Sequence, residues 1–212
     1  YVSLRNKKIN LIMDTGPSPS KKFSNKYQAG ALSFEFVSNG KKILTNSGYF
    51  SKNNIQLNEM SRSSAVHNIL VIDDNSSCKF KKNSNSELEI KDGLKITKKK
   101  IINEKNYWKI NAAHDGYLKK YNLFYEREIE FYPDNNKLIG IDKIIGKKML
   151  PNLKFDLRFH LNPLSKTMKT QDNKSILIEV EDEGWKFTCE NYEINIDNGL
   201  YFGKKNTYTE NQ

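Results

Sequence analysis

Short apolar segments separated by turn-forming residues run along the whole chain, and helix-like periodicity is nearly missing. Asn, Gly, Asp and Pro interrupt these segments repeatedly, for example at Ser38-Asn39-Gly40 and Asp134-Asn135-Asn136. Such residues favour turns because they accept left-handed backbone conformations or fix φ. Many short strands joined by turns predict an all-β fold, with a large sandwich of stacked antiparallel sheets in one domain over residues 1–212.

The apolar segments predict where the strands lie, and two polar stretches between them predict loops. The first loop covers residues 17–25, and the second covers residues 48–65. A loop longer than about 12–15 residues in a compact domain is often functional, so we single out the second one. The expected strands are residues 2–13, 31–37, 42–45, 67–72, 94–102, 108–112, 123–131, 137–145, 154–161, 175–180, 185–190 and 192–196.

One expected strand, residues 123–131, carries a charged residue on its apolar face. Because side chains alternate along a strand, Arg127 shares a face with Leu123, Tyr125, Ile129 and Phe131. An arginine in such a place must find a partner or reach solvent, so it indicates either a structural ion pair or a contact to a sugar carboxylate. The opposite face carries an acidic row, Glu126, Glu128 and Glu130.

The expected strand at residues 154–161 alternates in the same way. Its apolar side chains are predicted to face the core: Phe155, Leu157, Phe159 and Leu161. The other face then carries a polar row of Asp156, Arg158 and His160. A structural network with neighbouring strands is the simpler explanation of this row.

The charge of the chain is strongly positive, but its pattern does not indicate nucleic-acid binding. The formal net charge is +10, yet only four of the 35 basic residues are arginines and the lysines are scattered without interleaved aromatic residues. A diffuse positive field would still attract an acidic polymer. No apolar segment approaches the roughly 20 residues of a membrane span, so none is expected.

The cysteine content gives little constraint. Cys78 and Cys189 are the only cysteines, and they could pair in an oxidising compartment, although nothing in their spacing requires it. Two unpaired thiols are the simpler interpretation. The absence of a Cys-x-x-Cys motif excludes a metal site built from cysteines.

Several motifs follow one another in an order that resembles the heparinase II/III-like polysaccharide lyases. The first part contains Asp14-Thr15-Gly16-Pro17, Gln28-Ala29-Gly30-Ala31-Leu32-Ser33-Phe34-Glu35, Ile43-Leu44-Thr45-Asn46-Ser47-Gly48 and Arg62-Ser63-Ser64-Ala65-Val66-His67-Asn68. Further along come His114-Asp115-Gly116-Tyr117, Tyr125-Glu126-Arg127 and Arg158-Phe159-His160-Leu161-Asn162-Pro163. Each motif alone is weak, and the resemblance lies in their shared order over residues 2–202.

The resemblance implies a larger enzyme of which this chain is the C-terminal part. Members of the family combine an N-terminal α/α-toroid with a C-terminal stack of sheets, and the substrate cleft lies between the two. They cleave uronic-acid-containing polysaccharides by β-elimination. The implied partners are therefore an acidic polysaccharide and a toroid domain of the same protein, and the implied location is the periplasm or the cell exterior. The chain begins at Tyr1 without Met, as a C-terminal piece would.

The site positions implied by the resemblance depart from the family pattern. Relatives carry His-x-His-x-Asp before the Leu-Ser-Phe segment, and here those positions are Lys26, Gln28 and Gly30. A further ligand position is Asn46, and only His67 keeps a good zinc ligand. Neutral amide oxygens are poor partners for Zn²⁺, so zinc is not expected and a hydrogen-bonded pocket without metal is the preferred prediction.

No catalytic residue is assigned, because a lysine at position 26 is a poor base unless burial lowers its pKa. Turn chemistry and backbone hydrogen bonding are simpler alternatives for the histidines. A non-catalytic carbohydrate-binding or scaffold domain, and an enzyme that builds or trims the cell's own envelope polymer, remain open as functions. The candidate substrate-binding residues are Lys26, Gln28, Arg62, His67, His114 and Tyr117, and the family-equivalent metal positions are Gln28, Asn46 and His67.

Overall fold

The computed structural model describes residues 1–51, 54–85, 87–147, 151–203 and 207–211. Strands make up 47% of the chain and helices 10%, and the described residues form several antiparallel sheets and no barrel, which confirms the predicted all-β class. Among the described residues, no helix combines the length and the apolar character needed to cross a bilayer.

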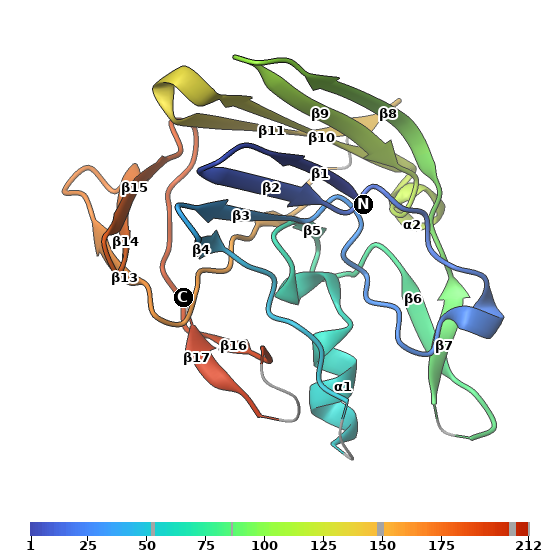
Figure 1. Cartoon of the computed structure of the whole chain (residues 1–212). Helices are drawn as coiled ribbons and strands as arrows, with labels where there is room; N and C mark the ends of the chain where they lie inside the picture. Colours follow the sequence, from blue (N-terminus) through green and yellow to red (C-terminus); the bar gives the residue numbers. More distant parts are fainter. Residues whose placement is uncertain (52–53, 86, 148–150, 204–206, 212) are drawn as a thin grey trace.

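The first sheet joins the N-terminal strands in the order β1 (Val2–Arg5), β2 (Ile9–Met13), β3 (Phe34–Ser38) and β4 (Lys41–Leu44) (Figure 1). Its alternation is clean in β2, where Ile9, Leu11 and Met13 are buried. The turn between β3 and β4 uses Asn39 at φ 46° and Gly40 at φ 80°, because a two-residue hairpin turn of type I′ needs positive φ at both positions.

The second sheet is the longest and has the order β11-β10-β9-β8. Its strands are β8 (Ile96–Asn103), β9 (Trp108–His114), β10 (Leu123–Tyr132) and β11 (Lys137–Gly146). Figure 1 shows this sheet stacked on the first one, and a single buried core contains residues of both. The rings of Phe36 and Phe131 meet across the two layers at 6.1 Å. The two stacked sheets are the predicted sandwich.

Smaller elements cover the ends and one side of the sandwich. Paired strands are β5 (Leu70–Ile72) with β12 (Phe155–Leu157), β6 (Lys79–Lys82) with β7 (Leu88–Asp92), β13 (Lys166–Lys169) with β14 (Ser175–Val180) and β15 (Glu183–Thr188), and β16 (Gly199–Tyr201) with β17 (Thr209–Asn211). The helices are α1 (Ile55–Ser61) and α2 (Leu118–Tyr121), with 3-10 turns η1 (Lys21–Phe23), η2 (Ser64–Val66) and η3 (Pro133–Asn135).

Arg127 is the charged centre of the sandwich. It is fully buried, as the alternation of β10 predicts, and its Nε and Nη2 donate to the two carboxylate oxygens of Asp142 at 2.7 and 3.2 Å. Its Nη1 donates to the carbonyl oxygens of Leu32, at 3.1 Å, and Asn68. The structural ion pair, one of the two alternatives left open by the sequence, is therefore confirmed, and it ties β10 to the segments before β3 and β5.

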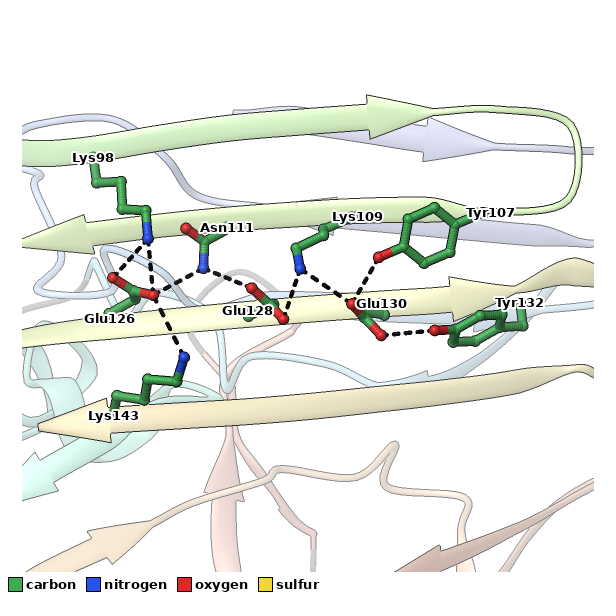
Figure 2. A network of polar contacts seen from close by, with 9 residues as sticks. All are labelled: Lys98, Tyr107, Lys109, Asn111, Glu126, Glu128, Glu130, Tyr132 and Lys143. Atoms are coloured by element: carbon green, nitrogen blue, oxygen red, sulfur yellow. Dashed lines mark hydrogen bonds and ion pairs between the residues drawn. The ribbon is translucent and has the colours of Figure 1, made fainter.

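The acidic row on the outer face of β10 is neutralised by the neighbouring strands, as Figure 2 shows. Glu126 accepts from Lys98 at 3.0 Å, and Glu130 accepts from Tyr107 at 2.7 Å. Lys109 bridges Glu128 and Glu130 at 2.8 and 3.2 Å. These contacts use the carboxylates internally, so this row is a feature of the sheet surface and not a candidate site.

Several expectations about secondary structure were wrong. Residues 192–196 form no strand, although Ile194 and Ile196 pack against the core. The polar residues 48–65 contain helix α1, because the Asn54 side chain accepts a hydrogen bond from the Leu57 amide and caps the helix start. Strands β6, β7, β13, β16 and β17 were missed, since their short polar sequences show too little alternation.

The expected strand at residues 154–161 ends early, at Leu157. Phe155 and Leu157, predicted to be core residues, are 39% and 38% exposed. The reason is that β12 pairs only with the three-residue β5 and lies at the edge of the fold, where the Phe155 ring packs on Tyr192 at 5.6 Å. Of the predicted face, only Leu161 is buried, with 7% of its surface exposed.

Candidate functional site

The candidate site forms where residues 26–30 meet the segment from Asn46 to Asn68. The Gln28 side-chain amide donates to the carbonyl oxygens of Gly48, at 2.8 Å, and Ser61, at 2.6 Å. The backbone amide of Ala29 donates to the carbonyl of Arg62 at 2.9 Å. Gln28 thus pins both ends of the connection that contains helix α1, and it does so from a position that the family resemblance marked.

His67 lies directly against residue 30. Its Nδ1 is 2.8 Å from the carbonyl oxygen of Ser63, which can only accept, so Nδ1 carries the proton and Nε2 keeps its lone pair. A Cβ on Gly30 would come within 2.4 Å of the His67 ring, so only glycine fits there. Burial, opposed by the Ser63 hydrogen bond, lowers the pKa of His67 to about 4. The imidazole is therefore neutral at neutral pH.

The three family-equivalent metal positions are occupied by backbone contacts. The side-chain oxygen of Asn46 accepts from the Asn68 amide at 2.9 Å, while Gln28 and His67 bond to carbonyl groups as described above. Within the described part of the chain, no group of three or more His, Cys, Asp or Glu side chains is placed to hold a metal. One imidazole with two hydrogen-bonded amides does not fit zinc, whose protein ligands are His, Cys and carboxylates.

His160 joins this site, although its place in the sequence did not predict it. Its Nε2 donates to the Ala65 carbonyl at 2.9 Å, and its Nδ1 faces the Ser47 hydroxyl at 3.3 Å. Burial first, and Arg158 in addition, lower the pKa of His160. The predicted polar row forms only in part: Arg158 pairs with Asp156 at 3.0 Å and with Asp74 at 3.3 Å, while His160 turns inward. Alternation failed here because the strand ends before His160.

Arg62 is a buried clamp beneath the site. Its guanidinium donates to the carbonyl oxygens of Ser24, Tyr27 and Leu88 at 2.7 to 2.9 Å and stacks on the Phe80 ring at 4.5 Å. With 1% of its surface exposed, it holds the 3-10 turn η1 and the β6–β7 hairpin around the segment that carries Gln28. Its assignment as a substrate contact stays a prediction.

Lys26 is the one member of the predicted substrate-binding set that is well exposed. His114 and Tyr117 lie elsewhere, in the core beside β10, and are 0% and 1% exposed. The Tyr117 hydroxyl donates to the Leu70 carbonyl at 3.1 Å, and burial lowers the pKa of His114 to about 3. A sugar contact at either residue would require the surrounding loop to move, so both assignments stay predictions.

The remaining sequence candidates can be placed as well. Both cysteines are free, with Cys78 buried and Cys189 partly buried. Burial raises the pKa of the Cys78 thiol to about 12, so it stays protonated at neutral pH. A protonated, buried thiol is a poor nucleophile, so Cys78 is not a candidate for catalysis.

Comparison with known proteins adds a family and a fold. A family model described as heparinase II/III-like, C-terminal, matches residues 1–212. Among solved structures, the heparan sulfate lyase HepC from Pedobacter heparinus superposes with a TM-score of 0.72 at 15% identity, covering 97% of this chain and 30% of that one. Heparinase III, the BT4657 gene product, gives 0.71 at 16% identity, covering 100% and 32%. No curated protein matches the chain. The chain therefore spans about a third of the length of the solved structures it resembles.

Proposed function

Because the chain belongs to the heparinase II/III-like family as its C-terminal domain, we propose that it forms one wall of the substrate cleft of a polysaccharide lyase. The observation that carries this proposal is the family match over residues 1–212. Support comes from the solved structures of the same fold, which are described as heparan sulfate lyase and heparinase III. The substrate class proposed is a uronic-acid-containing polysaccharide.

The reaction would be a β-elimination. A base takes the proton from C5 of the uronate, the electron pair forms the C4=C5 double bond, and the C4–O bond breaks as an acid protonates the leaving oxygen. The adjacent carboxylate must be neutralised as negative charge develops. Lys26 is exposed at the edge of the site and would supply a positive charge for that carboxylate.

The remaining residues of the site would act by positioning. Gln28, Arg62 and His67 are all committed to backbone carbonyls, so their role in the proposal is to fix the segment between Asn46 and Asn68. His67 is buried and neutral, which makes it a weak candidate for the base. The base and the acid would therefore come from the rest of the longer protein, for which we propose an N-terminal toroid domain and a periplasmic or secreted location.

The full-length protein tests this proposal when it is incubated with a panel of uronic-acid polymers. Lyase action is followed by the ultraviolet absorbance of the double bond conjugated to the carboxylate. We expect product with at least one polymer, and an increase in KM of about tenfold for Lys26→Gln, because one charge contact to the substrate is lost. Lys42→Gln, on the exposed side of β4, removes the same charge elsewhere and should leave KM unchanged.

A non-catalytic carbohydrate-binding domain is the second candidate. The replacement of the family's His-x-His-x-Asp residues by Lys26, Gln28 and Gly30 favours it. Binding of an acidic polymer by the full-length protein without any unsaturated product would support this candidate and contradict the lyase.

A further inference from the structure

A hollow of about 340 Å³ lies beside the candidate site, where the β6–β7 hairpin meets helix α2. Lys79 and Lys91 come from the hairpin, Lys119 comes from α2, and all three line the hollow. Asp92 and Asp115 complete its charged lining, so three ammonium groups face two carboxylates. A hollow of this size is within the range of small-ligand sites.

A β-bulge aims the lysines at this hollow. The register of the hairpin pairs Lys79 with Asp92 and Phe80 with Ile90, so Lys91 is an extra residue without a direct partner. In a regular strand Lys91 and Asp92 would point to opposite faces, yet both line the hollow. Bulges re-aim side chains in this way and are frequent next to functional sites.

The carboxylates do not neutralise all of the lysines. Lys119 donates to Asp92 at 2.5 Å, and this hydrogen bond, with the charges of Lys119, Lys79 and Lys91, lowers the pKa of Asp92. Asp115 accepts a hydrogen bond from the backbone amide of Lys95 at 2.7 Å. Among the described residues, no carboxylate forms an ion pair with Lys79 or Lys91. The ammonium groups of Lys79 and Lys91 therefore keep hydrogen-bond donors for an external anion, and the charged lining of the hollow carries a net positive charge.

The hollow is built by close backbone contacts and shares a wall with the candidate site. A Cβ on Gly116 would lie 2.5 Å from the Ser77 carbonyl oxygen, so glycine lets the two loops touch. Ser64 joins the two regions: its hydroxyl donates to the Ala29 carbonyl at 2.7 Å and accepts from the Ser77 amide at 3.0 Å. The loop under the hollow thus contacts the segment that carries Gln28.

We propose that this hollow is a second binding site for the anionic group, carboxylate or sulfate ester, of an acidic saccharide. Lys79 and Lys91 bind the anionic oxygens, and the Asp92–Lys119 pair holds the hairpin against α2. The proposal rests on the proposed function for the class of polymer, and it places a contact to that polymer beyond residues 26–30.

Calorimetry on the purified chain tests the site with two probes, an unsulfated glucuronate-containing tetrasaccharide and its sulfated counterpart. The double variant Lys79→Gln/Lys91→Gln should bind about tenfold more weakly, a loss of about 1.4 kcal/mol, because two exposed charge contacts are removed. The matched control is Lys7→Gln/Lys137→Gln, which removes two exposed lysines far from the hollow and gives the same net charge. The control should bind like the unmodified chain.

The outcomes separate the alternatives. If the double variant binds both probes more weakly, a carboxylate is sufficient for binding in the hollow. If it binds only the sulfated probe more weakly, the group bound there is the sulfate ester. Equal weakening of the control indicates a diffuse field and overturns the proposal, as does unchanged binding by the double variant or no binding by the unmodified chain. Lyase activity of the full-length protein is scored separately, so product without binding at the hollow refutes this site and leaves the proposed function standing.

Discussion

Replacing Arg127 with Lys should destabilise the chain strongly, although the charge is kept. The guanidinium makes two bonds to Asp142 and donates to the carbonyls of Leu32 and Asn68, all inside the sandwich. Lysine has one donor centre at the end of its side chain and cannot reach these acceptors together. The bond to the Leu32 carbonyl also stabilises a strained backbone, because Leu32 has φ 69° and depends on its surroundings to keep that conformation.

The expected cost follows from breaking a buried pair. Arg127 has no exposed side-chain surface and Asp142 has 8%. A lost contact therefore leaves a buried carboxylate or carbonyl without a hydrogen-bond partner, and water cannot reach it as a replacement. Such losses cost about 3–5 kcal/mol. For a chain of this size each kcal/mol lowers Tm by about 2–4 °C, so we expect a decrease of roughly 6–20 °C.

Urea unfolding followed by tryptophan fluorescence measures this cost, with Arg158→Lys as the matched control. Arg158 has 35% of its side chain exposed and pairs with Asp156 and Asp74 at the surface, so its replacement should cost less than about 1 kcal/mol. Equal small effects for the two variants would falsify the reasoning. If Arg127→Lys does not fold, Arg127→Met combined with Asp142→Leu should recover stability relative to Arg127→Met alone, because no unpaired charge remains.

Three further predictions concern the site and its surroundings. Gly30→Ala should lower the unfolding free energy by about 1–3 kcal/mol because its Cβ meets the His67 ring, whereas Gly184→Ala, with open space around it, should be neutral in the same melt. The pKa of His114 is lowered to about 3 in the fold, so the unfolded chain binds the proton first, and stability present above about pH 6.5 is lost as the pH falls toward 3. At pH 5 this group should lower the free energy of unfolding by about 2 kcal/mol relative to its value above pH 6.5. His114→Phe should therefore flatten the plot of Tm against pH over that range, and an unchanged slope contradicts the assignment. The Cys78 thiol should resist iodoacetamide at pH 8 in the folded chain and react after unfolding in urea, as mass spectrometry would show.

The elements that the sequence predicted well are those whose own residues decide their structure. Strand β10 alternates so strictly that its buried face, including Arg127, could be assigned before its partners were known. The Asn39-Gly40 turn was equally readable, because positive φ is a local requirement met by those two residue types. The β3–β4 turn and the strictly alternating strand β10 therefore depend on information that lies within a few neighbouring residues.

The elements that were missed depend on distant contacts. The β6–β7 hairpin is polar and short, and it is held in place by Arg62, which follows helix α1 and donates to the Leu88 carbonyl. Phe155 and Leu157 alternate like core residues but lie at an edge where no second layer covers them. A side-chain pattern predicts which residues share a face, and it cannot predict whether another layer packs on that face.

The site shows the same division. The sequence alone determined the sandwich, the family resemblance and the residues Lys26, Gln28, Asn46 and His67 at the marked positions. Only the tertiary structure decided that Gln28 and His67 form hydrogen bonds with backbone carbonyls. It also decided that His160, 93 residues after His67, lies in the same site. The physical reason is that a side chain's chemistry is fixed by its residue type, while its partners, its burial and its pKa depend on segments that meet only when the chain folds.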